Sequence, residues 1–182
     1  ACPHLKRLGV NRMNGVSFAM VLKKLESTLS LTSLSVNSCF VFQDMAGVTK
    51  LFPTKMASLT ELSSEYSKLN TDALQKLIRE FGDNLKVLKL TGNQSVDFCT
   101  VTKTMEHVDL GRTLVKDIEV RNGSSLTYLS LNGCPLSAKT LCKIGALTEL
   151  RTLLLSETKC DPDTVKVIAN MCGENLRTLH LT

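Results

Sequence analysis

The best candidate for chemistry in this sequence is a histidine with a carboxylate nearby, His107 and Asp109. Two residues apart on a strand, they share one side, and a carboxylate beside an imidazole can build a general base. However, no nucleophile motif or glycine-rich phosphate loop accompanies them, and the GVN, TGN and NGC segments are typical of turns. We therefore expect two solvated strand residues, and a chain that is not an enzyme and uses no cofactor.

Seven cysteines could bind a metal or form disulfides, but their spacing favours neither. The number is odd, no CxxC pair occurs, and Cys2 with His4 has no second ligand pair at metal-ligand spacing. We expect no metal site and interpret the cysteines as buried, reduced thiols, a state typical of the cytoplasm or nucleus. Their positions are 2, 39, 99, 134, 142, 160 and 172.

A repeated pattern, LxxLxL, positions these residues. It is clearest as LRTLHL from Leu176, and the preceding copies begin at residues 5, 31, 59, 85, 105, 126 and 150. The copies at 5, 31, 59, 85, 126 and 150 read LKRLGV, LTSLSV, LTELSS, LKVLKL, LTYLSL and LRTLLL, and the weaker one at 105 reads MEHVDL. The steps between first positions run from 20 to 28 residues, within the roughly 20 to 29 expected of leucine-rich repeats.

Alternation over the fourth to sixth positions has the period of a β-strand, and the following segment supplies the crossover that a parallel neighbour requires. Stacked copies then share one core. The pattern predicts an α/β solenoid, an open horseshoe of seven or eight parallel strands with helices on its convex face. Strand centres are expected at Leu8, Leu34, Leu62, Leu88, Val108, Leu129, Leu153 and Leu179.

The segments between strands differ in how clearly they predict helices. Helices are expected over 17–28, over 41–52 as a short piece, and after Asp72, which has capping-box spacing to Gln75. Two further helices begin at caps Ser137 and Asp161, the latter followed by Pro162 at the first helical position. Residues 94–125 are least regular, and we place Leu114 to Val120 on the convex side as a short helix or extended turn.

Two further positions matter to the fold. Ser64 occupies a sixth position, where an apolar residue is expected. The Cys, Asn and Thr residues at the ninth position suit a turn inside the coil, where a small side chain can meet free backbone groups. The ninth positions are Met13, Cys39, Ser67, Asn93, Thr113, Cys134 and Thr158.

Composition sets outer limits on function. The 182 residues suit one domain, 1–182, and 43% of them are hydrophobic, which allows a buried core. The net charge of +5 comes from scattered basic residues and aromatics are 4%, so nucleic-acid binding is not expected. No apolar run approaches the roughly 20 residues of a membrane span.

The last repeats carry a family resemblance. VIANMCGENLRTLHL, together with ACPHLKRLGV and LTYLSLNGC, resembles the cysteine-containing class of leucine-rich repeats, and F-box leucine-rich-repeat proteins above all. The resemblance implies a curved solenoid that holds a protein partner on its concave face, as the substrate-recognition part of a ubiquitin-ligase adaptor. No F-box precedes the repeats, and both ends fall inside the pattern. We therefore expect a piece of a longer solenoid, with ligase subunits bound elsewhere. An innate-immune or cytoskeletal leucine-rich-repeat scaffold is the alternative.

The third, fifth and seventh positions alternate with the buried ones and should face the concave side. Most are small and polar, as a merely solvated sheet would also show. Tyr128 and Leu154 stand out as exposed apolar groups, and Tyr and Arg are favoured anchors at protein interfaces. We predict that a protein partner contacts Lys89, His107, Asp109, Tyr128, Arg151 and Leu154.

Overall fold

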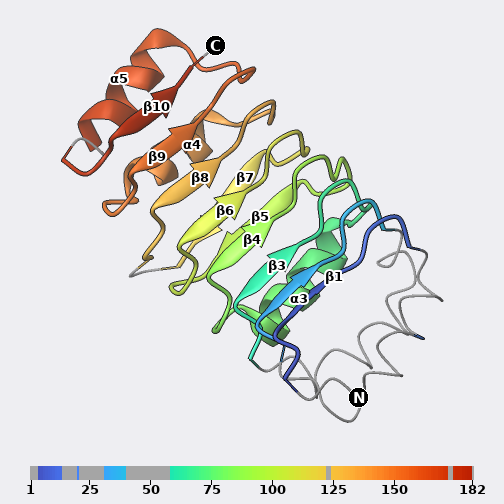
Figure 1. The fold of residues 1–182 in the computed structure, drawn as a ribbon. Helices are drawn as coiled ribbons and strands as arrows, with labels where there is room; N and C mark the ends of the chain where they lie inside the picture. The colour runs from blue at the N-terminus through green and yellow to red at the C-terminus, as the bar shows by residue number, and fades with distance from the viewer. Residues whose placement is uncertain are drawn as a thin grey trace.

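The computed structural model describes residues 4–13, 20, 31–39, 58–121, 124–171 and 174–181. The helices expected over 17–28 and 41–52 lie outside the described residues, apart from Met20. Cys2, Cys172 and Gly173 also lie outside them. The described part is an α/β structure in which short strands form one long sheet and helices lie along one of its faces (Figure 1).

Eight strands form the large sheet, and every pairing in it is parallel. Their order is β1-β2-β3-β4-β6-β8-β9-β10, so each strand lies beside the next copy of the sequence pattern. The strands are β1 Arg7–Gly9, β2 Ser33–Ser35, β3 Glu61–Ser63, β4 Val87–Lys89, β6 His107–Asp109, β8 Tyr128–Ser130, β9 Thr152–Leu154 and β10 Thr178–His180.

The eight predicted strand centres are confirmed. Each lies at the middle of a strand and pairs with the next centre along the sheet, as Leu34 does with Leu62 and Leu129 with Leu153. The first, fourth and sixth positions point into the core: Leu126, Leu129 and Leu131 are fully buried. Flanking positions are more accessible, because successive side chains of a strand point to opposite faces.

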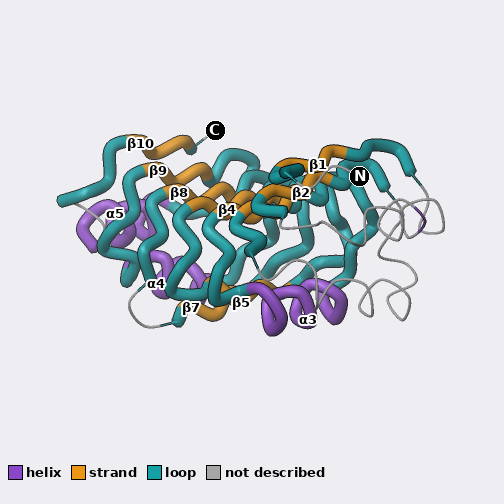
Figure 2. The backbone as a smooth tube through the Cα atoms, turned by 60° about the horizontal axis from the view of Figure 1, so that its bottom comes forward, coloured by secondary structure: helices purple, strands orange, loops and turns teal. Residues whose placement is uncertain are grey.

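Three described helices lie on one side of the large sheet (Figure 2), the side toward which the buried first, fourth and sixth positions point. They are α3 Thr71–Phe81, α4 Ala138–Gly145 and α5 Pro162–Met171. α3 packs its predicted stripe of Leu74, Leu77, Ile78 and Phe81 into the core and ends with Gly82 as its C-cap.

The predicted caps of α4 and α5 are confirmed, and that of α3 is wrong. Ser137 accepts a hydrogen bond from the Thr140 amide, and Asp161 accepts one from the Asp163 amide. In α3 the cap is Asn70, whose Oδ1 accepts from Ala73 N at 2.9 Å, so Asp72 falls in the first turn. Gln75 therefore completes no capping box and instead accepts a hydrogen bond from the Thr100 hydroxyl.

A second, two-stranded parallel sheet corrects the expectation for Leu114 to Val120. β5 Phe98–Val101 pairs with β7 Asp117–Val120, on the same side as the helices (Figure 2). The placement on that side was right, but the segment is a strand and neither a helix nor a turn. Steps of 20 and 21 residues leave little length for a helix, and an extended crossover spans the same distance with fewer residues.

Small polar side chains at the ninth position form a ladder through the turns, as predicted. Ser67 donates to Val36 O at 2.7 Å, and Cys134 Sγ donates to Leu110 O at 3.1 Å. The Asn93 side chain makes four such hydrogen bonds: its Nδ2 donates to two carbonyls, and its Oδ1 accepts from Ser67 N and Leu69 N. These bonds satisfy backbone groups that the turns would otherwise bury without partners.

The eighth position of the pattern has a left-handed backbone in seven successive copies. Its φ runs from 52° to 77°. In six of the seven copies, the N–H donates to the seventh-position carbonyl of the neighbouring copy, at 2.6 to 3.2 Å. This bonding explains why non-glycine residues hold the conformation. The residues are Arg12, Ser38, Tyr66, Gly92, Arg112, Gly133 and Glu157.

The prediction that the cysteines are buried, reduced thiols holds for some of the described cysteines. Cys39, Cys99 and Cys134 are buried and free, Cys160 is half-buried, and Cys142 lies exposed on α4. The expectation of burial was therefore wrong for Cys142, which sits on the outer side of a helix that buries Leu141 and Ile144. Among the described helices, none is long and apolar enough to cross a membrane.

Candidate functional site

Two rows of side chains run across the large sheet on the face opposite the helices, which we call the sheet face. The parallel register places Val87, His107, Tyr128 and Thr152 in one row. Lys89, Asp109, Ser130 and Leu154 form the second row. Neighbouring strands in a sheet are about 4.8 Å apart, so successive members of a row are adjacent. Five of the six predicted contact residues thus meet on one surface.

His107 and Tyr128 stack at the centre of this surface. They are directly paired across β6 and β8, with ring centroids 3.9 Å apart and ring planes within 2° of parallel. Each ring is half-buried by the other and by its row neighbours. Aromatic pairs contribute about 0.5–1.5 kcal/mol beyond their buried area, so the stack holds both side chains in place before any partner arrives.

Both rings are neutral near pH 7. Burial lowers the pKa of His107, Lys89 lowers it further and Asp109 opposes them. Burial raises the pKa of Tyr128, Asp109 adds to the rise, and a hydrogen bond with Ser130 opposes it. The centre of the site is therefore an uncharged aromatic pair, and a cation, Lys89, and an anion, Asp109, lie side by side in the row next to it.

No hydrogen bond joins Asp109 to His107 among the described residues. The Asp109 Oδ1 accepts a hydrogen bond from Gly111 N at 3.0 Å, which directs the carboxylate toward the turn after β6. The dyad suggested by the sequence is therefore two separate sheet-face groups in this structure. Among the described residues, no group of three or more His, Cys, Asp or Glu is arranged to hold a metal ion.

Tyr128 and Leu154 are less accessible than predicted. Both are half-buried, not exposed, because side chains on adjacent strands flank them. Arg151 lies outside the rows: it directly precedes β9 and is exposed. Its backbone joins β8 to β10, since its N–H donates to Thr127 O and its carbonyl accepts from Arg177 N and Thr178 N.

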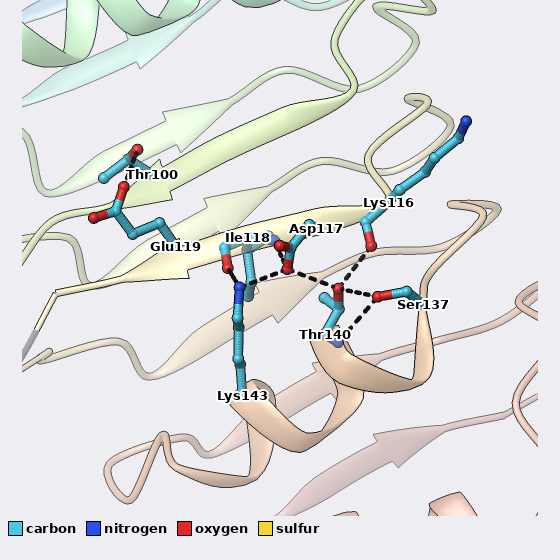
Figure 3. A network of polar contacts seen from close by, with 8 residues as sticks. All are labelled: Thr100, Lys116, Asp117, Ile118, Glu119, Ser137, Thr140 and Lys143. Atoms are coloured by element: carbon cyan, nitrogen blue, oxygen red, sulfur yellow. Dashed lines mark hydrogen bonds and ion pairs between the residues drawn. The ribbon is translucent and has the colours of Figure 1, made fainter.

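A second polar cluster, on the helix side, was not predicted. Lys143 of α4 donates to Asp117 Oδ1 at 2.7 Å and to Ile118 O at 2.8 Å, both on β7 (Figure 3). Thr140 donates to Lys116 O and Asp117, and the Thr140 amide donates to the Ser137 hydroxyl. The Lys143 hydrogen bond is the main cause that lowers the pKa of Asp117.

This cluster fastens α4 to β7. A cavity of about 360 Å³ lies beside it, with Glu119, Arg121, Ser124 and Lys143 among its lining residues. Sequence reasoning missed the cluster because it placed Asp117 and Glu119 in a helix or turn. In the structure both lie on β7, where Asp117 accepts from Lys143 of α4 and Glu119 accepts from the Thr100 hydroxyl of β5. The alternation of polar and apolar residues in DIEV was the signal that could have revealed a strand there. We assign the cluster a structural role.

Comparisons with known proteins do not assign this chain to a family. The sequence matches no protein-family model, and no curated protein matches it either.

Proposed function

We propose that the chain is a single leucine-rich-repeat solenoid, residues 1–182, with the sheet face as the concave side of an open horseshoe. Two observations support this. The copies of the pattern stack in register along the sheet. The eighth and ninth positions repeat the same backbone conformation and the same kind of hydrogen bond from copy to copy.

Its proposed function is to bind a protein partner on the sheet face, without catalysis and without a cofactor. The stacked, half-buried His107–Tyr128 pair carries this proposal. Binding energy concentrates on a few centrally placed aromatic and arginine side chains surrounded by polar residues. Here Val87 and Thr152 flank a fixed aromatic pair in its own row, and Lys89, Asp109, Ser130 and Leu154 form the row beside it.

Within protein binding, we propose substrate recognition for a ubiquitin-ligase adaptor. The support is the resemblance of VIANMCGENLRTLHL and LTYLSLNGC to the cysteine-containing repeats of F-box proteins. Ligase subunits would bind through regions outside this chain. Free thiols agree with a cytoplasmic or nuclear location. A partner whose lifetime is unchanged when the chain is depleted from cells would favour the alternative, a scaffold unrelated to ubiquitin.

The test uses the two tyrosines of the chain as a matched pair. Tyr128 lies on the sheet face, whereas Tyr66 is 52% exposed in the turn after β3. Proteins captured by the parent chain, by Tyr128→Ala and by Tyr66→Ala are quantified by mass spectrometry. The partner should be depleted with Tyr128→Ala, corresponding to at least about 1 kcal/mol of binding energy, and retained with Tyr66→Ala.

Melting temperatures of the variants show that each is folded. Equal capture by the parent and Tyr128→Ala would move the binding site off the sheet face.

A further inference from the structure

The chemistry of the sheet face narrows the kind of partner, given the function proposed above. The sheet-face positions of β8, β9 and β10 carry no carboxylate: they are Tyr128, Ser130, Thr152, Leu154, Thr178 and His180. Exposed arginines, Arg151 and Arg177, directly precede β9 and β10. Glu149 and Glu174 lie further back, before these strands begin. The rows across β8, β9 and β10 therefore present polar and apolar groups and no anion, with Arg151 and Arg177 before the strands and Glu157 in the turn after β9.

The carboxylates of the other strands are already engaged. Glu61 pairs with Arg7 at 3.3 Å, and Glu65 accepts a hydrogen bond from Asn37 at 3.0 Å. Asp109 accepts from Gly111 N. Lys89 differs: among the described residues its ammonium forms no ion pair, although its charge reaches His107 closely enough to lower that pKa. Lys89 is thus the sheet-face cation that is available to an acidic group.

Lys89 and Leu154 lie in the same row, three strand steps apart, on β4 and β9. At about 4.8 Å per strand this is roughly 14 Å, which an extended peptide covers in about four residues at 3.3–3.4 Å each. Residues i and i+4 of an extended chain point to the same side. A peptide crossing the strands can therefore place one side chain at Lys89 and another at Leu154.

We propose that the sheet face binds an extended acidic segment of a protein that crosses β4, β6, β8 and β9. An Asp or Glu of the segment pairs with Lys89. An apolar side chain four residues away rests on Leu154 and the edge of Tyr128. The residue midway between them faces the Asp109 and Ser130 region and is small and polar or basic, because an acid there would meet the Asp109 carboxylate.

The probe is a library of random 12-residue peptides displayed on phage and selected on the immobilised 182-residue chain. The baits are the parent, Lys89→Glu, Lys89→Gln and Tyr128→Ala. Lys76→Glu is the matched control, because Lys76 is exposed on α3 and the substitution changes the net charge equally. Circular dichroism and melting temperature establish that every bait is folded.

The parent should enrich peptides with an acidic and an apolar residue four positions apart, in either order, and Lys76→Glu should enrich the same set. Lys89→Glu should replace the acid by Lys or Arg, and Lys89→Gln should lose the preference. A synthetic peptide of the enriched sequence should bind Lys89→Glu at least about tenfold more weakly than the parent, measured by fluorescence anisotropy, and more weakly at high salt.

The two proposals fail in different ways. Two outcomes would overturn the acidic segment and leave protein binding on the sheet face standing. In one, the enriched peptides depend on Tyr128 but show no preference for an acidic residue. In the other, that preference remains in Lys89→Glu. Peptides unaffected by Tyr128→Ala, or no enrichment at all, would overturn the acidic segment and count against the sheet face as the binding surface.

Discussion

At the scale of single residues, two buried serines three positions apart have opposite hydrogen-bonding states. Ser64 is fully buried at a sixth position, and its hydroxyl has no hydrogen-bond partner among the described residues. Ser67 is equally buried, but its hydroxyl donates to Val36 O and accepts from Cys39 N. An unsatisfied buried hydroxyl costs about 1–3 kcal/mol, whereas a satisfied one contributes about 1 kcal/mol.

We therefore expect Ser64→Ala to raise the free energy of unfolding by about 1 kcal/mol and Ser67→Ala to lower it by a similar amount. Urea denaturation of both variants beside the parent measures the two changes. A loss of stability in Ser64→Ala as large as that in Ser67→Ala would mean that the Ser64 hydroxyl does have a partner.

His107 gives the stability a pH dependence. Because burial and Lys89 lower its pKa in the folded chain, the unfolded chain, near the ordinary value of about 6.5, binds more protons at mildly acidic pH. Stability from His107 is therefore present above about pH 6.5 and is lost as pH falls toward the folded-state pKa. The difference in unfolding free energy between pH 7.5 and 5.5 should be smaller in His107→Gln. Identical differences in the two proteins would contradict this.

At the scale of elements, the sequence pattern predicts which residues of α3 are buried but does not predict where the helix begins. Its buried stripe follows from spacing alone, because helical periodicity places Leu74, Leu77, Ile78 and Phe81 on one face. The start of α3 does not follow from spacing, because Asn and Asp are both good N-cap residues. Which of Asn70 and Asp72 caps the helix depends on which of them has an extended backbone. Asn70 has φ −109° and ψ 170°, so it is the cap.

Asn70→Ala should lower the free energy of unfolding by about 1 kcal/mol, within the 0.5–2 kcal/mol range of lost caps. Asp72→Ala is the matched control, since the exposed Asp72 only interacts with the helix dipole, at about 0.3–1 kcal/mol. Thermal or urea unfolding ranks the two variants. A larger loss from Asp72→Ala would support the capping box expected from sequence.

The strands divide in the same way. The centres of the large sheet were predictable, because a leucine pattern with a period of 2 buries every second residue and repeats eight times. β5 and β7 were not, because the expectation for Leu114 to Val120 rests on its short distance to Leu126, which leaves no room for a full crossover. The segment is indeed outside the large sheet. Its pairing with Phe98–Val101 joins segments far apart in the sequence, which this spacing does not predict.

At the scale of the whole molecule, the sequence predicts which residues share the sheet face but not how they interact. Register brings His107 and Tyr128 opposite each other, yet their stacking and the turn of Asp109 toward Gly111 depend on side-chain rotamers. The polar cluster of Asp117 and Lys143 was out of reach, since its partners are 26 residues apart and lie on an unpredicted strand and a helix.

The thiols lead to a prediction for the whole fold. Because the five described cysteines are free, a reducing agent should leave the melting temperature unchanged. Of the five described cysteines of the native chain, iodoacetamide should modify Cys142 first. Cys39, Cys99 and Cys134 should react only on unfolding, because they are buried and burial raises the pKa of Cys99 to about 12. Peptide mass spectrometry follows both reactions. A marked fall in melting temperature on reduction would indicate disulfides.

The left-handed eighth position has a consequence for how this protein can evolve. One backbone conformation there carries arginine, serine, tyrosine, glutamate and glycine, so neighbouring copies impose the conformation and the side chain does not. The surface at the turns can therefore change its charge and shape through neutral drift while the course of the chain stays the same. Drift toward glycine even removes a backbone cost of about 1–2 kcal/mol. This freedom is smallest at Gly92, where an added Cβ would lie 2.2 Å from the Tyr66 ring, so these two positions can only change together.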